Sequence, residues 1–377
     1  RTKIIATVGP ATSTDESLDR IIAAGVDVVR LNLSHGAIEE HLERIVQVRA
    51  ASERAGRAVG VLADLPGPKI RAGRFDSDGV YLEAGTHVEL REGAGPSDAD
   101  VVHVDYDDLL ESMEIGDRIT IGDGAITVEV TEVRKDSATA LVMTGDRTQG
   151  RPGVHLSSNR TSLSSPTSDD LVLAERVATA GVDFIAVSFV RHGSDVQAVR
   201  EVVGDRASLV AKIETSVAVD NLEEFLVAAD AIMVARGDLG IDCPLEDVPH
   251  LQKAIVRRCI EYGTPVITAT QMLESMIHAP SPTRAEVTDV ANAVFDGTDG
   301  LMLSGETAIG RDPAGVVAQM ASIAERAEAE ASYRQWAQRL GRVQREHWDS
   351  TSDRITAALC HAASDAAVDV EATAILC

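Results

Sequence analysis

Three ionisable side chains stand directly after two apolar runs of this chain, and their types suit work on a phosphorylated substrate. Lys212 and Glu214 close the run that starts at Leu209, and Asp238 follows the run Ala231–Ala235. If these runs are neighbouring parallel strands, their carboxyl ends meet at one edge and bring the three groups together. Two carboxylates can hold a divalent metal, and an ammonium can neutralise a phosphate or an enolate. The pattern therefore predicts metal-assisted chemistry on an anion.

Lysine is scarce in this chain, and this makes Lys212 more informative. The chain has 35 Lys plus Arg residues, yet lysine occurs only at Lys3, Lys69, Lys135, Lys212 and Lys253. Where arginine is used almost everywhere, a lysine indicates a position that needs a compact point charge instead of a planar fork. The alternative interpretation is structural: each acid would be a surface carboxylate or an ion-pair partner, and Lys212 would pair with Glu214.

Composition limits the classes of function. The 377 residues, 44% hydrophobic and 25% charged, are typical of a globular protein larger than one ordinary domain. The formal net charge of −25 argues against a nucleic-acid partner, which needs a basic face. No apolar run is long enough to span a membrane, and the four cysteines form no CxxC pair, so we expect a cytoplasmic protein. Excess acid with scarce lysine also suits a high-salt cytoplasm, although a high-GC genome would likewise favour arginine.

Eight short apolar runs predict the fold. They are Ile4–Val8, Val28–Leu33, Val59–Leu65, Phe184–Val190, Leu209–Ile213, Ala231–Ala235, Pro265–Thr270 and Leu301–Leu303. Most are near-continuous, as expected for parallel strands covered on both faces. Helix-like stretches lie between them, such as Leu222–Ala229 after the cap Asp220 and Val316–Ala331 after Asp312. We therefore predict an α/β protein built on a (β/α)8 TIM barrel, with its active site after the strands.

Polar residues fall where that barrel predicts an active site. Seven consecutive runs end in residues able to do chemistry or bind a ligand: Arg30, Asn32, Ser34, His35, Asp64, Ser188, Arg191, Lys212, Glu214, Asp238, Thr270, Ser304 and Glu306. Such a distribution is hard to obtain by chance, and it favours a barrel enzyme.

An insertion interrupts the regular spacing of the runs. Between the third and fourth runs the pattern becomes β-like and rich in turns, with Asp123-Gly124 as a hairpin signal. We predict that residues 71–152 form a small inserted β-barrel that acts as a lid and excludes water from the site. The barrel would then comprise residues 1–70 and 153–331.

The last part of the chain is expected to begin another domain. Thr356–Val368 reads as a helix and Ala372–Cys377 as a strand. Residues 332–377 would thus be the incomplete start of a C-terminal α/β domain.

Several segments carry a resemblance to a known family. They are Thr2–Pro10, Arg30–Gly36, Asp64–Arg71, Ser188–Arg191, Lys212–Glu214, Arg236–Gly240, Ala269–Met276, Pro282–Glu286 and Met302–Ala308. Together they closely resemble pyruvate kinase, in order, over about residues 1–330. The resemblance implies glycolytic transfer of a phosphoryl group from phosphoenolpyruvate to ADP, giving pyruvate and ATP. It also implies the same barrel with a β lid and a C-terminal domain, assembled as a homotetramer when full length.

The resemblance assigns roles to the residues of the central pair of strands. Glu214 and Asp238 would hold Mg2+ or Mn2+, and Lys212 would stabilise the transferring phosphoryl group and then the enolate. Gly237 and Asp238 open a helix whose free N–H groups can receive the substrate carboxylate. Thr270 would contact substrate near the proton path to the enolate carbon, or would only cap the following helix.

Further roles follow from the same resemblance. Arg30 would neutralise the phosphoryl group from the opposite side, while Ser304 and Glu306 would order waters of the proton relay. The side chains that would face the nucleotide phosphates are Asn32, His35 and Arg71. His35 has the alternative of being only a capping or solvated histidine.

The monovalent-cation site departs from the family pattern. Many pyruvate kinases bind K+ through oxygens equivalent to those of Asn32, Ser34, Asp64 and the Leu65 carbonyl. They usually carry an acid where this chain has Lys69. The chain therefore resembles the branch that needs no K+, because an ammonium from Lys69 can supply the positive charge. We predict that K+ is dispensable.

A second departure lies in the lid, and alternatives to the kinase stay open. The family's Lys-Gly-Val-Asn-Leu-Pro segment reads here as residues 152–157 with Pro152 in place of the lysine, which puts nucleotide contacts from the lid in doubt. One alternative is a Mg2+-dependent aldolase or lyase of the phosphoenolpyruvate/pyruvate barrel group, which normally lacks the lid. Another is a non-catalytic paralogue that senses phosphorylated metabolites.

Overall fold

The computed structural model describes residues 2–122, 124–156, 161, 163–331, 351–370 and 372. The barrel strands are β1 (Lys3–Thr7), β2 (Val28–Asn32), β3 (Gly60–Asp64), β12 (Phe184–Val187), β13 (Ser208–Ile213), β14 (Ala231–Ala235), β15 (Val266–Ala269) and β16 (Gly300–Leu303). The inserted strands are β4 (Phe75–Tyr81), β5 (His87–Glu92), β6 (Val101–Val104), β7 (Arg118–Ile121), β8 (Ile126–Val133), β9 (Ala138–Thr144), β10 (Arg147–Gly150) and β11 (Val154–His155).

Twelve α-helices complete the described part of the chain. They are α1 (Asp15–Ala23), α2 (Ile38–Ala55), α3 (Ser168–Thr179), α4 (Gly193–Val203), α5 (Ser216–Asp220), α6 (Leu222–Ala228), α7 (Arg236–Asp242), α8 (Val248–Tyr262), α9 (Arg284–Asp296), α10 (Gly305–Ala308), α11 (Pro313–Glu330) and α13 (Thr351–Asp369). Three short 3-10 helices are η1 (Pro10–Thr12), η2 (Gly204–Arg206) and η3 (Glu274–Ile277).

Eight parallel strands close into a barrel in the order β1-β16-β15-β14-β13-β12-β3-β2. Helices cover the outer face, and this is why the strands read as near-continuous apolar runs. Side chains from all eight strands fill the interior: the buried Ile5, Leu62, Ala186, Val210, Met233, Ala269 and Met302, and the partly buried Val28, Phe184, Ala231 and Ile267 packed against them. The α/β class and the barrel that the sequence predicted are confirmed.

Helix starts follow from local capping chemistry. Thr14, Thr167 and Thr283 each accept a hydrogen bond from the backbone N–H of the third helical residue, and Asp312 caps α11 in the same way. The expectation that Asp220 caps the next helix is wrong. Asp220 ends the additional short helix α5, which Thr215 caps, and Asn221 occupies the cap position of α6.

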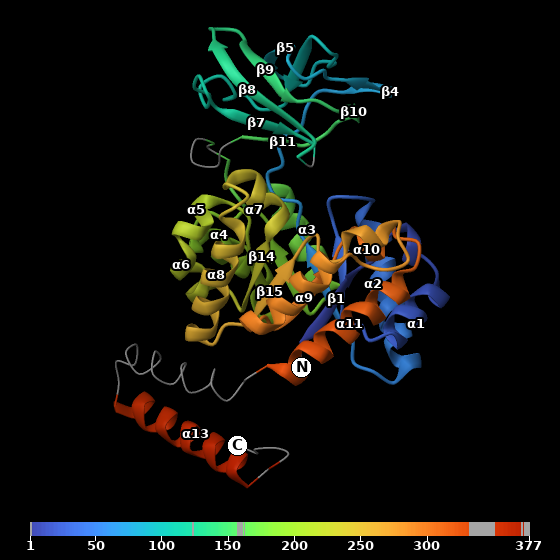
Figure 1. The fold of residues 1–377 in the computed structure, drawn as a ribbon, viewed down its shortest axis with the longest axis vertical. Coiled ribbons are helices and arrows are strands. Elements are labelled where there is room, and N and C mark those ends of the chain that lie inside the picture. Colours follow the sequence, from blue (N-terminus) through green and yellow to red (C-terminus); the bar gives the residue numbers. More distant parts are fainter. Residues whose placement is uncertain are drawn as a thin grey trace.

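The inserted strands form a unit with its own core. A six-stranded sheet has the order β11-β7-β8-β9-β5-β6, and β10 pairs with β4. Bridges join Arg71 to Gly153 and Ala72 to Val104, so the segment that leads into this unit links the two edges of the larger sheet. Figure 1 shows the unit over the end of the barrel where α7 lies. Because α7 starts directly after β14, this is the end formed by the carboxyl termini of the strands.

The C-terminal helix α13 contains the predicted helix Thr356–Val368. It lies on the opposite side of the barrel from the inserted strands (Figure 1). The predicted strand Ala372–Cys377 lies outside the described residues except for Ala372. None of the described helices combines the length and the hydropathy that crossing a membrane requires.

Candidate active site

Lys212 is the buried centre of the site. It lies one residue before the end of β13, and only 8% of it is exposed. Its ammonium lies 2.7 Å from Ser188 Oγ, 2.9 Å from Glu214 Oε1 and 3.1 Å from Asp64 Oδ1. Burial alone would lower the pKa of Lys212, but the charges of Asp64 and Glu214 outweigh it and raise the pKa above its ordinary value. Lys212 is therefore a fixed cation inside the barrel mouth.

Asp64, the last residue of β3, is shared by two cations. Its Oδ2 accepts a 2.7 Å hydrogen bond from Arg30 Nε, and its Oδ1 faces Lys212. Burial would raise the pKa of Asp64, but Lys212 and Arg30 together lower it below its ordinary value. Arg30 also donates to Thr7 Oγ1 at 2.9 Å. Sequence reasoning placed Asp64 at the barrel mouth as a monovalent-cation ligand and missed this bridging position.

Glu214 is buried and short of compensating charge. Its Oε2 accepts a 2.6 Å hydrogen bond from the backbone N–H of Phe189. Its Oε1 is 2.9 Å from Lys212 Nζ, but it accepts no hydrogen bond of good geometry from any described residue. Burial raises the pKa of Glu214, and the charge of Lys212 lowers it. The effect of burial is the larger, so the pKa rises to about 7. Lys212 also pairs with Asp64, so its charge is divided between two carboxylates, and Glu214 has room for a further cation.

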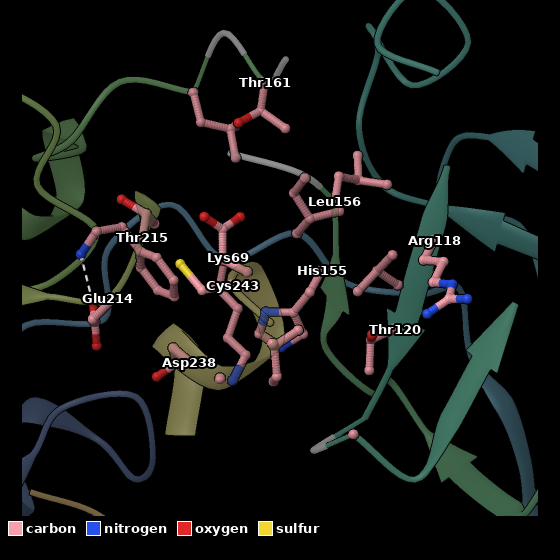
Figure 2. A pocket seen from close by; sticks show the side chains of 18 of the residues that line it. Lys69, Arg118, Thr120, His155, Leu156, Thr161, Glu214, Thr215, Asp238 and Cys243 are labelled. Carbon is pink, nitrogen blue, oxygen red and sulfur yellow. Dashed lines mark hydrogen bonds between the residues drawn. The ribbon is translucent and has the colours of Figure 1, made fainter. Parts of the chain in front are cut away.

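A cavity of about 760 Å³ lies between the barrel mouth and the inserted strands. Figure 2 shows Glu214 and Asp238 on the barrel side and Arg118 and Thr120 on the opposite side. Asp238 lies in the first turn of α7. The cavity thus has carboxylates on one wall and a guanidinium on the other.

The two carboxylates fit a magnesium ion. Among the described residues, no group of three or more His, Cys, Asp or Glu side chains is placed to hold a metal. Mg2+ usually binds proteins through one or two carboxylates and completes its shell with water and substrate oxygens. Glu214 Oε1, which accepts no hydrogen bond from the described residues, and Asp238, which also lines the cavity, supply that donor set.

Thr270 follows β15 in a strained backbone conformation. Its φ is 71°, and Gln271 and Phe189 also have positive φ, at 53° and 54°. All three residues stand directly after or close to barrel strands, at the carboxyl end. A β-branched residue in this region is an outlier that costs on the order of 1–3 kcal/mol and marks functional sites.

The Thr270 hydroxyl is held from two sides. It accepts a 2.7 Å hydrogen bond from the Gly237 backbone N–H and donates to the Ala269 carbonyl at 2.6 Å. The following helix η3 has Leu273 at its cap position without a side-chain hydrogen bond. The structure therefore does not support the alternative that Thr270 only caps that helix. It also shows that the Gly237 N–H, which was expected to receive a substrate carboxylate, is engaged by Thr270.

Ser304 and Glu306 join two active-site loops. Glu306 is fully buried; its Oε2 accepts from the Ser304 N–H at 2.7 Å and its Oε1 from the Leu273 N–H at 3.1 Å. Neither residue lines the cavity. Their contacts tie the loop after β16 to the loop after β15.

The residues expected to face the nucleotide lie outside the cavity lining. Asn32 ends β2, and its Oδ1 accepts from the Ser34 N–H at 3.2 Å. His35 is exposed, and Arg71 donates to the Arg151 carbonyl at 3.3 Å. These residues stand close to the ends of barrel strands in the sequence. The structure nevertheless does not bring their side chains into the cavity that Glu214 and Asp238 line.

The expected monovalent-cation ligands are partly engaged by the protein. The Leu65 carbonyl accepts a 2.7 Å hydrogen bond from Ser188 Oγ, and Asp64 is paired as described above. Lys69 is exposed on the cavity wall (Figure 2) and forms no ion pair with a described carboxylate. Its side chain lies against Gly153, where an added Cβ would approach Lys69 Cε to 2.8 Å.

Other residues of the site received no role from the sequence. Ser188 was recognised as a strand end, but its contacts with Lys212 and Leu65 depend on how β12 lies beside β3 and β13. Arg118 and Thr120 of β7 reach the cavity only because the inserted unit folds over the barrel. No local sequence signal marks such contacts.

Comparisons with known proteins agree with the barrel fold. The family model described as "Pyruvate kinase, barrel domain" matches residues 1–317. A pyruvate kinase of Methylorubrum extorquens is 43% identical over 361 residues, which are 96% of this chain and 75% of that protein. A pyruvate kinase of Mycobacterium tuberculosis is 44% identical over 326 residues, 86% of this chain and 69% of that protein. One of Geobacillus stearothermophilus is 40% identical over 369 residues, 96% of this chain and 62% of that protein.

Proposed function

The chain belongs to the pyruvate kinase family, and we propose on that basis that it transfers a phosphoryl group from phosphoenolpyruvate to ADP, giving pyruvate and ATP. The observation that carries this function is Lys212, buried at the barrel mouth among Asp64, Ser188 and Glu214. The relatives' names support the phosphotransferase and not the aldolase, lyase or sensor alternatives.

The protein would catalyse this reaction mainly by positioning the reacting groups and neutralising their charge. The bond between phosphorus and the enol oxygen breaks, and a bond from phosphorus to a terminal oxygen of ADP forms. The electron pair left on the enol oxygen gives an enolate, which takes a proton at its methylene carbon to become pyruvate. The Lys212 ammonium, held in a water-poor site, stabilises the negative charge on the moving group and on the enolate.

Glu214 and Asp238 would hold Mg2+ or Mn2+ at the cavity wall. When bound, the ion supplies positive charge to the phosphoryl and enolate oxygens. Arg30, on the other side of Asp64 from Lys212, would neutralise the phosphoryl group. Thr270, with its hydroxyl held by Gly237, would lie near the proton path, and Ser304 and Glu306 would order waters there.

K+ is dispensable in this proposal. The charge of Asp64 is already balanced by Arg30 and Lys212, and the Leu65 carbonyl already accepts a hydrogen bond from Ser188. Because these groups already have partners, a bound monovalent ion would add little further charge stabilisation. Lys69 brings a further positive charge to the cavity wall.

The inserted unit would act as a lid. We propose a barrel of residues 1–70 and 153–331, with residues 71–152 closing over the cavity when ADP binds. The short strand β11 lies just beyond that boundary and pairs with β7, so it would move with the lid. Asn32, His35 and Arg71 would face the nucleotide phosphates on closure. We expect the protein to act in the cytoplasm. We also expect it to assemble as a homotetramer when full length, and light scattering would test this assembly.

The function is tested by pyruvate formation from phosphoenolpyruvate and ADP in the presence of Mg2+. We expect turnover that requires both the nucleotide and the metal. The aldolase or lyase alternative predicts chemistry on phosphoenolpyruvate or pyruvate that does not depend on ADP. Binding of phosphoenolpyruvate without any turnover by the folded protein would contradict the proposal and favour a sensor.

A further inference from the structure

Arg236, the first residue of α7, uses every N–H group of its guanidinium. Nε donates to the Ala269 carbonyl at 3.2 Å. Nη2 donates to the Thr270 carbonyl at 2.7 Å and to Met272 Sδ at 2.8 Å. Nη1 donates to Asp289 Oδ1 at 2.7 Å and to Gln252 Oε1 at 3.3 Å. The side chain is only 12% exposed. Three of these five contacts go to one short stretch of chain, the turn after β15.

That turn contains the strained pair Thr270 and Gln271, with φ of 71° and 53°. Positive φ at non-glycine residues persists only where surrounding contacts over-determine the conformation. Arg236 supplies such contacts before, at and after the strained pair, through Ala269, Thr270 and Met272. The next residue in the chain, Gly237, then holds the Thr270 hydroxyl through its N–H.

We propose that Arg236 is a positioning residue for the reaction. Its planar fork fixes the backbone of Thr270 so that the hydroxyl stays at the barrel mouth, beside the helix that carries Asp238. This inference rests on the proposed function, because it assigns a purpose to Thr270 in that reaction. A lysine could keep the charge beside Asp289, but it has one nitrogen and could not hold both carbonyls and the sulfur.

The inference makes Arg236 and Thr270 act as one unit, and a double-mutant cycle tests this. For Arg236→Lys we expect a fall in kcat of up to about 10²-fold with little change in KM, because small displacements of catalytic groups have effects of that size. In a Thr270→Ala background the same substitution should have little further effect. Equal losses in both backgrounds would overturn the proposal, as would wild-type kcat in Arg236→Lys.

A second readout separates positioning from general stability. In the proposed function Thr270 lies near the proton path to the enolate carbon. Arg236→Lys and Thr270→Ala should therefore both slow the exchange of pyruvate methyl protons for deuterium. Arg200→Lys is the matched control: Arg200 also donates to backbone carbonyls, of Gly204 and Ala207, and pairs with Asp230, but at the opposite end of the barrel. Arg200→Lys should leave kcat and exchange unchanged; a loss equal to that of Arg236→Lys would overturn the proposal.

A milder variant covers the case in which Arg236→Lys does not fold. Asp289→Asn removes one charged partner of Arg236 and leaves the fork in place. We expect a smaller fall in kcat that again vanishes in the Thr270→Ala background, and persistence of the fall there would contradict the proposal. Wild-type enzyme is assayed in parallel, so absence of wild-type turnover refutes the proposed function, whereas normal turnover of the Arg236 variants refutes only this inference.

Discussion

At the scale of single residues, the site depends on one carboxylate that serves two cations. Asp64 receives Arg30 on one oxygen and Lys212 on the other, and all three side chains are buried. Glu214 has only a share of the Lys212 charge and keeps one oxygen without a hydrogen bond from the described residues. Asp64 therefore organises the cations, while Glu214 is left available for a metal.

Removing the Asp64 charge should destabilise the fold strongly. In Asp64→Asn the buried Arg30 loses its carboxylate partner and Lys212 keeps only Glu214. Breaking a buried ion pair costs roughly 3–5 kcal/mol. Urea unfolding would measure the loss. Asp19→Asn is the control, since Asp19 pairs with Arg54 at the surface, where ion pairs contribute little. Equal stability of the two variants would contradict the buried-cation account.

The charge of Lys69 should determine the need for K+. In Lys69→Glu an acid replaces the ammonium on the cavity wall, and we expect lower turnover in tetramethylammonium chloride that KCl restores. Lys135→Glu, at an exposed position in the inserted unit, should show neither effect. Lys69→Glu kinetics that are unchanged and indifferent to the salt would rule out this role.

At the scale of elements, the loop that leads from β3 into the inserted unit packs tightly on the active site. Gly67 has φ of +68°, and an added Cβ would lie 2.8 Å from Phe189 Cδ2 and 3.0 Å from Ser188 Cβ. Ser188 contacts Lys212, and the Phe189 N–H donates to Glu214. The loop thus connects the position of the inserted unit to Lys212 and Glu214 of the candidate site.

Gly67→Ala should lower both stability and turnover. The matched control is Gly56→Ala, because Gly56 has a similar φ of +62° but nothing within 4 Å of an added Cβ. The control should lose about 1 kcal/mol from backbone strain alone and keep its kcat. Thermal unfolding and steady-state kinetics of the pair would measure the difference. Identical losses in both would show that the contacts with Ser188 and Phe189 are unimportant.

Much of this arrangement could be predicted from sequence, because strands buried on both faces leave continuous apolar runs. The run Ala231–Ala235 coincides with β14, and the other seven barrel strands were placed within a few residues. Contacts between distant segments could not be predicted. The Lys212–Asp64 pair and the Arg236 contacts with the turn after β15 depend on barrel register, for which a single sequence carries no local signal.

At the scale of the whole molecule, the net charge of −25 sets the protein's response to salt. Self-repulsion among so many carboxylates destabilises the compact state at low ionic strength and is screened by added salt. The proposed site does not explain this charge, because the proposed substrates are themselves anions. We interpret it as a property of the surface that favours concentrated salt.

Activity should therefore be retained or increased in molar KCl. The increase should also occur in tetramethylammonium chloride of equal ionic strength, because screening does not depend on which cation is used. Turnover measured across both salt series would separate this effect from a specific K+ requirement. Inactivation at molar salt would contradict the high-salt interpretation. A high-GC genome would then be the explanation of the arginine-rich composition.

If the buried Lys212 ammonium stabilises the charge that moves in phosphoryl transfer, the turnover of Lys212→Met with phosphoenolpyruvate, ADP and Mg2+ should show it. Lys253→Met is the matched control, because Lys253 pairs with Asp296 on the outer helices. We predict that Lys212→Met loses at least about 10²–10³-fold in kcat, as expected for removal of a group that stabilises transition-state charge. The control should be unaffected. Turnover of a folded Lys212→Met enzyme at the rate of the control would contradict the account.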